Sequence, residues 1–324
     1  HSAALQIAAQ HDPVWGGFGG APKFPQAMGL ETLLRYVLAT GDPTALEVVT
    51  TTLDAMASGG IYDHLGGGFS RYSVDDRWLV PHFEKMLYDN ALLSRAYLHA
   101  WQVTGHDRWF QVASETIDYV RRDLRHPGGG FYSAEDADSE GVEGKFYIWS
   151  EKEIREVCRG DTEAALSWYG VTPKGNFEGA NILIRPERGA LVRPEDVERS
   201  RVALFRQRER RIRPGLDDKV LTEWNGLMLS TLAEAAAATG RTDWLEDAVS
   251  NAQFLWENLR RDDGRWMRSW QAEGGAQHLG YAADHAAMVD GLVRLGEATG
   301  EARWTDMAVD TADTLLNRFS DQDN

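Results

Sequence analysis

A motif of fixed length occurs four times in this chain of 324 residues. In each copy, a residue pair is followed, fifteen residues after its second member, by the glycine of a Thr-Gly dipeptide. Such constant spacing is typical of a repeated structural unit, so this motif limits the possible folds more than any other feature. The copies are Pro25-Gln26 with Gly41, Asp89-Asn90 with Gly105, Trp224-Asn225 with Gly240, and Asp284-His285 with Gly300.

Each copy predicts a helix that runs from the pair to the glycine. Apolar residues recur between them at helical spacing, as at Ala91, Leu92, Ala96 and Leu98. Asp and Asn are typical N-caps, and glycine readily adopts the left-handed conformation of a C-cap. A second helix is expected directly after the glycine, which makes each copy a helical hairpin. Three copies carry a tryptophan four residues after the glycine, and these are expected to pack in the core: Trp109, Trp244 and Trp304.

The distances between copies predict one further hairpin. Successive Thr-Gly glycines lie 64, 135 and 60 residues apart, so the middle interval is about two periods long. We therefore expect five hairpins, over about 25–58, 89–124, 149–213, 223–260 and 284–318, in one all-α domain that spans 1–324. A ring of such hairpins is an (α/α)6-type toroid, and an open solenoid is the alternative. Five hairpins would leave a ring of six incomplete.

The links between hairpins predict where function lies. Within a hairpin the Thr-Gly turn is short, whereas the links 59–88, 126–149 and 261–283 are long and rich in glycine and aromatic residues. Because hairpins alternate in direction, all the long links are expected at the end opposite the Thr-Gly turns. Functional residues concentrate on such loops.

Composition excludes several classes of partner. The net charge of −16 and the pI near 5.0 argue against nucleic acid and anionic membranes as partners. A single cysteine, Cys158, excludes an internal disulfide and a CxxC site, and a cytoplasmic location is expected. No HExxH motif is present, and the calcium-like run from Asp136 to Gly141 has Tyr147 where the bidentate Glu is required. We expect neither a metal nor a cofactor.

Five long motifs identify a family resemblance. They closely resemble the YyaL-like family, relatives of the spermatogenesis-associated thioredoxin-like protein. The resemblance implies a toroid similar to N-acylglucosamine 2-epimerase, cellobiose 2-epimerase and six-hairpin glycosidases. It also implies a thioredoxin-like domain as a partner in a longer protein, ending about where this chain begins. The motifs are Trp15 to Pro25, Gly59 to Phe69, Pro81 to Asn90, Tyr132 to Gly141, and Asp217 to Gly226.

Two histidines could catalyse sugar 2-epimerisation or isomerisation. This reaction needs a base and an acid on opposite faces of the sugar, and histidine suits both roles because its pKa lies near neutrality. His82 and His285 are the expected pair. A small-molecule substrate, expected to be a sugar, would be positioned by Arg71, Asp89, Trp224 and Asn225.

Carboxylates offer a second reading, glycoside hydrolysis. This reaction needs two carboxyl groups beside the scissile bond. Glu84 and Asp89 are among the candidate catalytic residues, but the sequence does not select a pair from the carboxylates expected at this end, which are Asp63, Glu84, Asp89, Asp136, Asp217, Asp218 and Glu223. A third reading is a non-catalytic binding module for the thioredoxin-like domain. The further residues expected to contact substrate are Asp63, His64, Asn90, Asp136 and Asp284.

Overall fold

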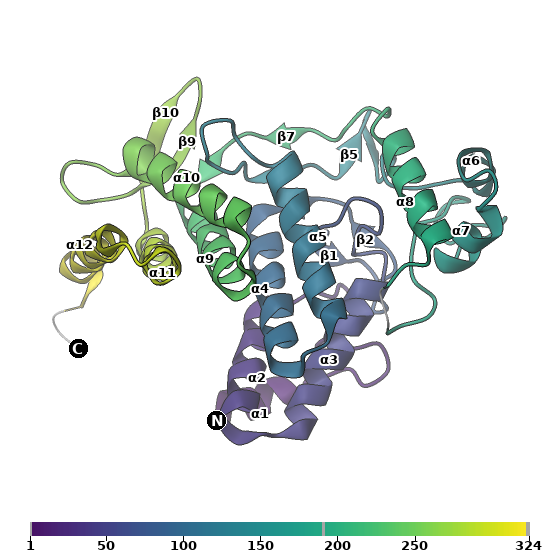
Figure 1. The fold of residues 1–324 in the computed structure, drawn as a ribbon, viewed down its shortest axis with the longest axis horizontal. Helices are drawn as coiled ribbons and strands as arrows, with labels where there is room; N and C mark the ends of the chain where they lie inside the picture. Colours follow the sequence, from purple (N-terminus) through teal and green to yellow (C-terminus); the bar gives the residue numbers. More distant parts are fainter. Residues whose placement is uncertain (1, 190–191, 322–324) are drawn as a thin grey trace.

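The computed structural model describes residues 2–189 and 192–321. Its main body consists of helical hairpins (Figure 1), and the short helix α1 (Ser2–Ala8) packs on α2. The four hairpins are α2 (Ala27–Thr40) with α3 (Pro43–Ser58), α4 (Leu87–Thr104) with α5 (Asp107–Asp123), α9 (Thr222–Thr239) with α10 (Thr242–Leu259), and α11 (Ala282–Thr299) with α12 (Ala302–Phe319).

The repeated glycines end the first helix of every hairpin, as predicted. Gly41, Gly105, Gly240 and Gly300 all have φ between 70° and 72°, the left-handed conformation that glycine adopts without strain. Each amide also donates a hydrogen bond to the carbonyl four residues earlier. The Thr-Gly motif therefore marks the C-cap in all four copies.

The residue pairs do not supply N-caps in the last three copies, which corrects the expectation. The helices α4, α9 and α11 begin two or three residues earlier, after the N-caps Met86, Leu221 and Tyr281. These N-cap residues have extended backbone, and in α11 the third helical residue, Asp284, accepts a hydrogen bond from the amide of the N-cap Tyr281. The pairs consequently lie in the first turn of each helix.

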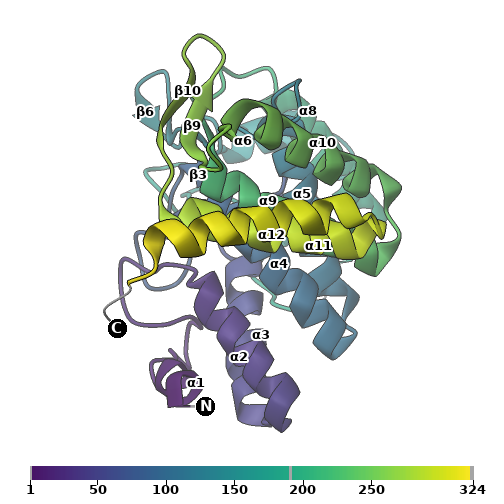
Figure 2. The ribbon, with the colours of Figure 1, turned by 90° about the vertical axis from the view of Figure 1, so that its left-hand side faces the viewer.

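The hairpins form two layers of an open arc. The first helices are neighbours in the order α2, α4, α9 and α11, while the second helices α3, α5, α10 and α12 lie outside them (Figure 2). The predicted tryptophans are buried against the inner layer, with Trp109 and Trp244 0% exposed and Trp304 1% exposed. Close packing of α9 on α11 requires glycine, because a Cβ at Gly226 would lie 2.8 Å from the backbone of Ala287.

The expected hairpin over 149–213 is not part of this arc. The predicted helices are present as α6 (Glu151–Val157), α7 (Thr162–Trp168) and α8 (Glu195–Arg208), but they pack on one another around their own hydrophobic core. Helices α4 and α9 contact each other directly. Moreover, α6 and α7 have only seven residues each. The arc therefore holds four hairpins within 2–189 and 192–321, and the count of five is corrected.

The long links gather at one end and pair with one another, as the repeat predicted. Within the described ranges the strands pair antiparallel, and they form two three-stranded sheets, β3–β4–β7 and β8–β9–β10, and two small ribbons. In Figure 1 several of these strands lie along the upper edge. Within the described ranges, no helix has the length and hydropathy needed to cross a membrane. The strands are β1 (Tyr72–Ser73), β2 (Pro81–His82), β3 (Lys85–Met86), β4 (Ala134–Glu135), β5 (Asp138–Ser139), β6 (Val142–Glu143), β7 (Leu216–Asp217), β8 (Val220–Leu221), β9 (Met267–Gln271) and β10 (Gly275–Leu279).

Candidate functional site

Asn90, Asn225 and His285 occupy equivalent positions, the fourth residue of α4, α9 and α11. Each is 0% exposed. Asn90 Oδ1 accepts a hydrogen bond from the Phe69 amide at 2.7 Å, and its Nδ2 donates to the Phe69 carbonyl at 3.1 Å. Asn225 contacts the Phe131 amide and carbonyl in the same way, at 2.8 and 3.0 Å. These side chains fasten the preceding link to the inner helix.

His285 performs the corresponding task in the last copy. Its Nε2 accepts a hydrogen bond from the Trp266 amide at 3.4 Å, and its Nδ1 lies 2.9 Å from the Tyr281 carbonyl. Both ring nitrogens are thus occupied in a fully buried position. The structure does not bring His285 together with His82, and it gives Asn90, Asn225 and His285 a structural role instead of substrate contact.

The partners of these three residues were missed in the sequence, although a signal exists. Phe69, Phe131 and Trp266 are each 0% exposed aromatic residues, and each follows a glycine by one or two positions. This second repeated motif lies in the links and pairs with the first one. A comparison of the links with one another could have found it.

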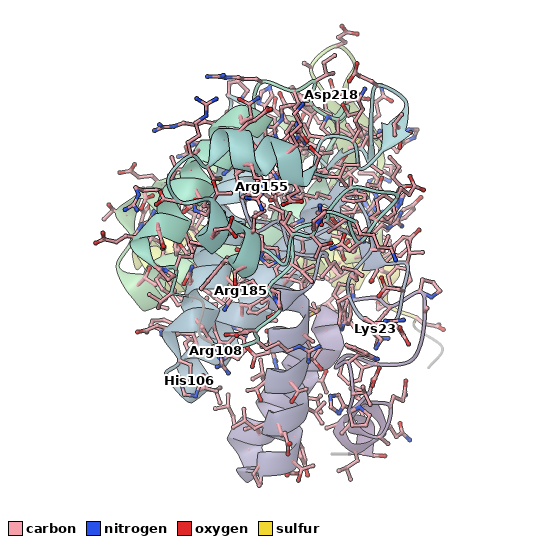
Figure 3. The ribbon with its side chains drawn as sticks, turned by 90° about the vertical axis from the view of Figure 1, so that its right-hand side faces the viewer. Lys23, His106, Arg108, Arg155, Arg185 and Asp218 are labelled. Carbon is pink, nitrogen blue, oxygen red and sulfur yellow. The ribbon has the colours of Figure 1, made fainter. Side chains whose placement is uncertain are left out.

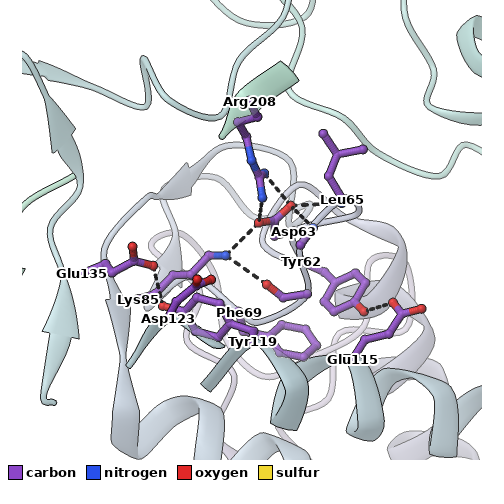
Figure 4. A network of polar contacts seen from close by, with 12 residues as sticks. Tyr62, Asp63, Leu65, Phe69, Lys85, Glu115, Tyr119, Asp123, Glu135 and Arg208 are labelled. Carbon is purple, nitrogen blue, oxygen red and sulfur yellow. Dashed lines mark hydrogen bonds and ion pairs between the residues drawn. The ribbon is translucent and has the colours of Figure 1, made fainter. Parts of the chain in front are cut away.

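Asp63 lies at the centre of a buried ionic network (Figure 4). Its two carboxylate oxygens each accept from Arg208 at 2.8 Å, and Oδ2 also accepts from Lys85 Nζ at 2.9 Å. Burial raises the pKa of Asp63, but Arg208 and Lys85 outweigh burial and hold the pKa well below its usual range. Sequence patterns missed both cations. Arg208 belongs to the arginine-rich helix α8, which resembles a solvated helix face, and Lys85 lies in β3, away from that segment.

This Asp63 network fixes the glycine-rich loop and leaves little room for a ligand. Lys85 also donates to the Gly67 carbonyl at 3.0 Å. His64 lies 2.8 Å from the Gly59 carbonyl, and burial lowers the pKa of its imidazole to about 4. The cavity beside these residues has a volume of only about 30 Å³, room for a few water molecules at most. Asp63 and His64 therefore belong to the scaffold.

A second cluster of charged residues lies on the same long-link end and is partly exposed. Arg71 donates to Glu84 at 3.2 Å, and their side chains are 41% and 25% exposed. His82 Nδ1 lies 2.7 Å from Glu143 Oε1, and its Nε2 lies 3.6 Å from Glu84. The rings of His82 and Tyr72 stack with centroids 4.9 Å apart.

Asp89, the third residue of α4, is the most perturbed member of this cluster. Its Oδ2 is buried and has no hydrogen-bond partner within the ranges that the structure describes. Burial raises the pKa of its carboxyl to about 7, Glu84 contributes to the rise, and Tyr88 and Arg71 oppose it. The Tyr88 ring in turn packs on Trp224 at 4.9 Å. We call Arg71, His82, Glu84, Tyr88, Asp89 and Trp224 the Asp89 cluster.

The remaining predicted residues lie outside the Asp89 cluster. Asp284 is 0% exposed and accepts from the Tyr281 amide at 2.7 Å, from the Glu223 amide at 2.9 Å and from Arg268 at 2.8 Å. Asp136 forms a local turn in which it accepts from the Ala137 amide at 2.6 Å. Within 2–189 and 192–321, no three His, Cys, Asp or Glu side chains are grouped so that they could hold a metal ion.

Comparisons with known proteins give relatives in sequence. No protein-family model matches the chain. Spermatogenesis-associated protein 20 of Homo sapiens is 38% identical over 364 residues, which cover 98% of this chain and 46% of the relative. An uncharacterised protein of Caenorhabditis elegans is 31% identical over 342 residues, 91% of this chain and 47% of the relative. The chain spans about half the length of the curated relatives that it matches.

Solved structures show the same fold at low identity. A family 76 α-mannanase of Bacteroides thetaiotaomicron superposes with a TM-score of 0.62 and 9% identity, over 100% of this chain and 71% of that one. An α-1,6-mannanase of Salegentibacter, solved as an inactive variant with α-1,6-mannotriose, gives a TM-score of 0.54 and 13% identity, over 97% and 70%. The predicted all-helical α/α toroid fold is thereby confirmed. The predicted resemblance is confirmed as well: the chain is a relative of spermatogenesis-associated protein 20 and aligns with about half of its length.

Proposed function

We propose that this protein acts on carbohydrate by hydrolysing a glycosidic bond at the Asp89 cluster. The observation that carries the proposal is the carboxyl of Asp89, whose Oδ2 is buried without a partner and whose pKa is raised to about 7. Such a carboxyl keeps its proton close to neutral pH and can therefore serve as a general acid. The glycoside hydrolases with the same fold make a sugar the natural class of substrate to test.

Glu84 is the second carboxyl group in the proposed reaction. It lies within electrostatic range of Asp89 and is ion-paired with Arg71 at 3.2 Å. Asp89 donates its proton to the glycosidic oxygen as the bond to the anomeric carbon breaks. Glu84 either takes a proton from the attacking water or attacks the anomeric carbon itself, and the anomer released distinguishes these routes. The rings of Tyr88 and Trp224 offer an aromatic surface against which a sugar can pack.

Epimerisation by two histidines receives less support from the geometry. His82 is partly exposed in the Asp89 cluster, but His285 is buried and both of its nitrogens are occupied. The burial of His285 therefore argues against this pair as the acid and base on opposite faces of one sugar. We accordingly favour the carboxyl groups over the histidines.

One experiment distinguishes glycoside hydrolysis from epimerisation and from sugar binding without catalysis. The protein is incubated in D2O with a panel of oligosaccharides that includes α-1,6-mannotriose, and the sugars are followed by NMR. We expect cleavage of a glycosidic bond without deuterium at C2, whereas deuterium at C2 would support epimerisation and refute hydrolysis. Sugar binding without turnover would favour the non-catalytic alternative, in which the toroid serves a thioredoxin-like domain of a longer protein.

Variants then test the assignment of Asp89. Asp89→Asn cannot donate the proton, and we expect the rate to fall about 10²–10⁴-fold, the usual contribution of a general acid. Because the protonated form is the active one, wild-type activity should decline as pH rises above about 7, through the pKa of Asp89. Asp263→Asn, on an exposed turn, is the matched control and should keep full activity. Cleavage by Asp89→Asn at the wild-type rate would remove Asp89 from the mechanism.

A further inference from the structure

Arg185 is a buried cation without a counter-ion. Its side chain belongs to the segment between α7 and α8, and the residue is only 8% exposed. Nη1 is buried without a hydrogen-bond partner, and within the described ranges no carboxylate forms an ion pair with this side chain. The Trp168 ring, 4.4 Å from the guanidinium carbon, is its recorded side-chain contact. Burial, with help from Arg193, lowers the pKa of Arg185 from its ordinary value.

A buried guanidinium group without a counter-ion destabilises the folded protein unless an anion or hydrogen bonds compensate for its lost hydration. Removing a charged group from water carries a penalty of several kcal/mol, which an ion pair or hydrogen bonds normally offset. Elsewhere in this acidic protein buried arginines do have carboxylate partners, as Arg208 does with Asp63. The missing partner at Arg185 therefore indicates an anion that does not belong to the chain.

The surroundings of Arg185 add positive charge. A cavity of about 200 Å³ is lined by Arg77, Arg185 and Arg188 together with Trp15, and no carboxylate lines it. Asp54 and Glu187 are the acids that act electrostatically on Arg185, but Asp54 also interacts with Arg108 and Arg188 and accepts its hydrogen bond from Arg108 at 3.1 Å. Figure 3 shows Arg185 and Arg108 on one side of the molecule. The charge of Asp54 is therefore shared among three guanidinium groups.

A second cavity on Arg185 is a poorer place for an anion. It measures about 350 Å³, but Glu187 and Asp196 line it, and their negative charge would repel an anionic ligand. The 200 Å³ cavity has the opposite balance of charge. It also has apolar walls, because Leu79, Ile184 and the Trp15 ring contribute to it.

We infer that the cavity formed by Arg77, Arg185, Arg188 and Trp15 binds a small phosphate monoester. Guanidinium groups match the geometry of phosphate oxygens and can donate two hydrogen bonds at once. Three arginines suit a dianion better than a monoanionic carboxylate. The phosphate group contacts Arg185, and the organic part of the molecule lies against Trp15 and Leu79.

Thermal unfolding with glycerol 3-phosphate tests the site. The wild-type protein should show a concentration-dependent rise in Tm that potassium chloride at equal ionic strength does not reproduce. Inorganic phosphate should act in the same direction at higher concentration, since it lacks the organic part. A rise in Tm that chloride matches would overturn the proposal.

Substitutions test whether glycerol 3-phosphate binds in the cavity beside Arg185. Arg185→Gln should weaken the binding of glycerol 3-phosphate, measured by calorimetry, at least about tenfold, as expected for a lost charged hydrogen bond. Its Tm without ligand should equal or exceed that of the wild type, because the charge removed has no partner; a lower Tm would point to a structural role instead. Arg188→Gln, an exposed change that does not disturb packing, should weaken binding as well. Arg155→Gln is the control on another surface, and equal losses in it and in Arg185→Gln would refute the site.

Discussion

The two ionic clusters at the long-link end differ in how their charges are balanced. In the Asp63 network each oxygen of the carboxylate meets a cation at 2.8–2.9 Å, and the group is 6% exposed. In the Asp89 cluster the central carboxyl has an oxygen without a partner, and its neighbours are partly open to solvent. Burial affects both carboxyl groups, yet the pKa falls in one and rises in the other. Balanced charges hold the links in place, whereas the unbalanced one is available for chemistry.

Removing Asp63 should have the largest effect on stability. Asp63→Ala leaves Lys85 and Arg208 buried without their anion, and we expect the free energy of unfolding to drop by about 3–5 kcal/mol. Urea denaturation measures the loss. Glu156→Ala, which breaks an exposed pair with Lys152, is the control and should cost about 1 kcal/mol or less. Equal losses in the two variants would abolish the contrast between buried and exposed pairs.

Removing the charge of Asp89 should raise the free energy of unfolding at pH 8, whereas removing Asp63 lowers it. The pKa of its carboxyl is about 7 in the folded state and near 3.8 in the unfolded state. Between these values the folded protein holds a proton that the unfolded chain has lost, so wild-type stability falls as pH rises from about 4 to about 7. Asp89→Asn should remove this fall and gain roughly 4 kcal/mol at pH 8. Parallel pH profiles of stability for the two proteins would contradict the raised pKa.

Asn90 and Asn225 each anchor a link to an inner helix through their side-chain amides, and removing one of these anchors should lower the free energy of unfolding least. Asn225→Ala leaves the Phe131 amide and carbonyl without their side-chain partner, and we expect a loss of about 2 kcal/mol in denaturant unfolding. Asn90→Ala should behave in the same way through Phe69. If either change abolished sugar turnover while stability stayed at the wild-type level, the anchor would have a catalytic role that its burial argues against.

The sequence predicted much of the fold and part of the site. The Thr-Gly repeat located the ends of four inner helices, and hairpin direction placed the long links together. Glu84, Asp89, Arg71, His82 and Trp224 were predicted and do come together. The inserted segment 149–213 was misassigned because interval length cannot tell a ring hairpin from helices that pack elsewhere. Lys85, Arg185 and Arg208 were missed because their environment depends on distant parts of the chain.

The features that could be predicted from the sequence depend on residues close together in the chain. A glycine C-cap acts on a carbonyl four residues away, and helical periodicity extends over one helix, so both can be recognised in a short window. Which charged groups form ion pairs or hydrogen bonds depends instead on the tertiary structure. Asp63 and Arg208 are separated by 145 residues, and Asn225 and Phe131 by 94. Electrostatic balance depends on distance in space and on exclusion of water, so only the folded chain shows that Asp63 is satisfied while Asp89 and Arg185 are not.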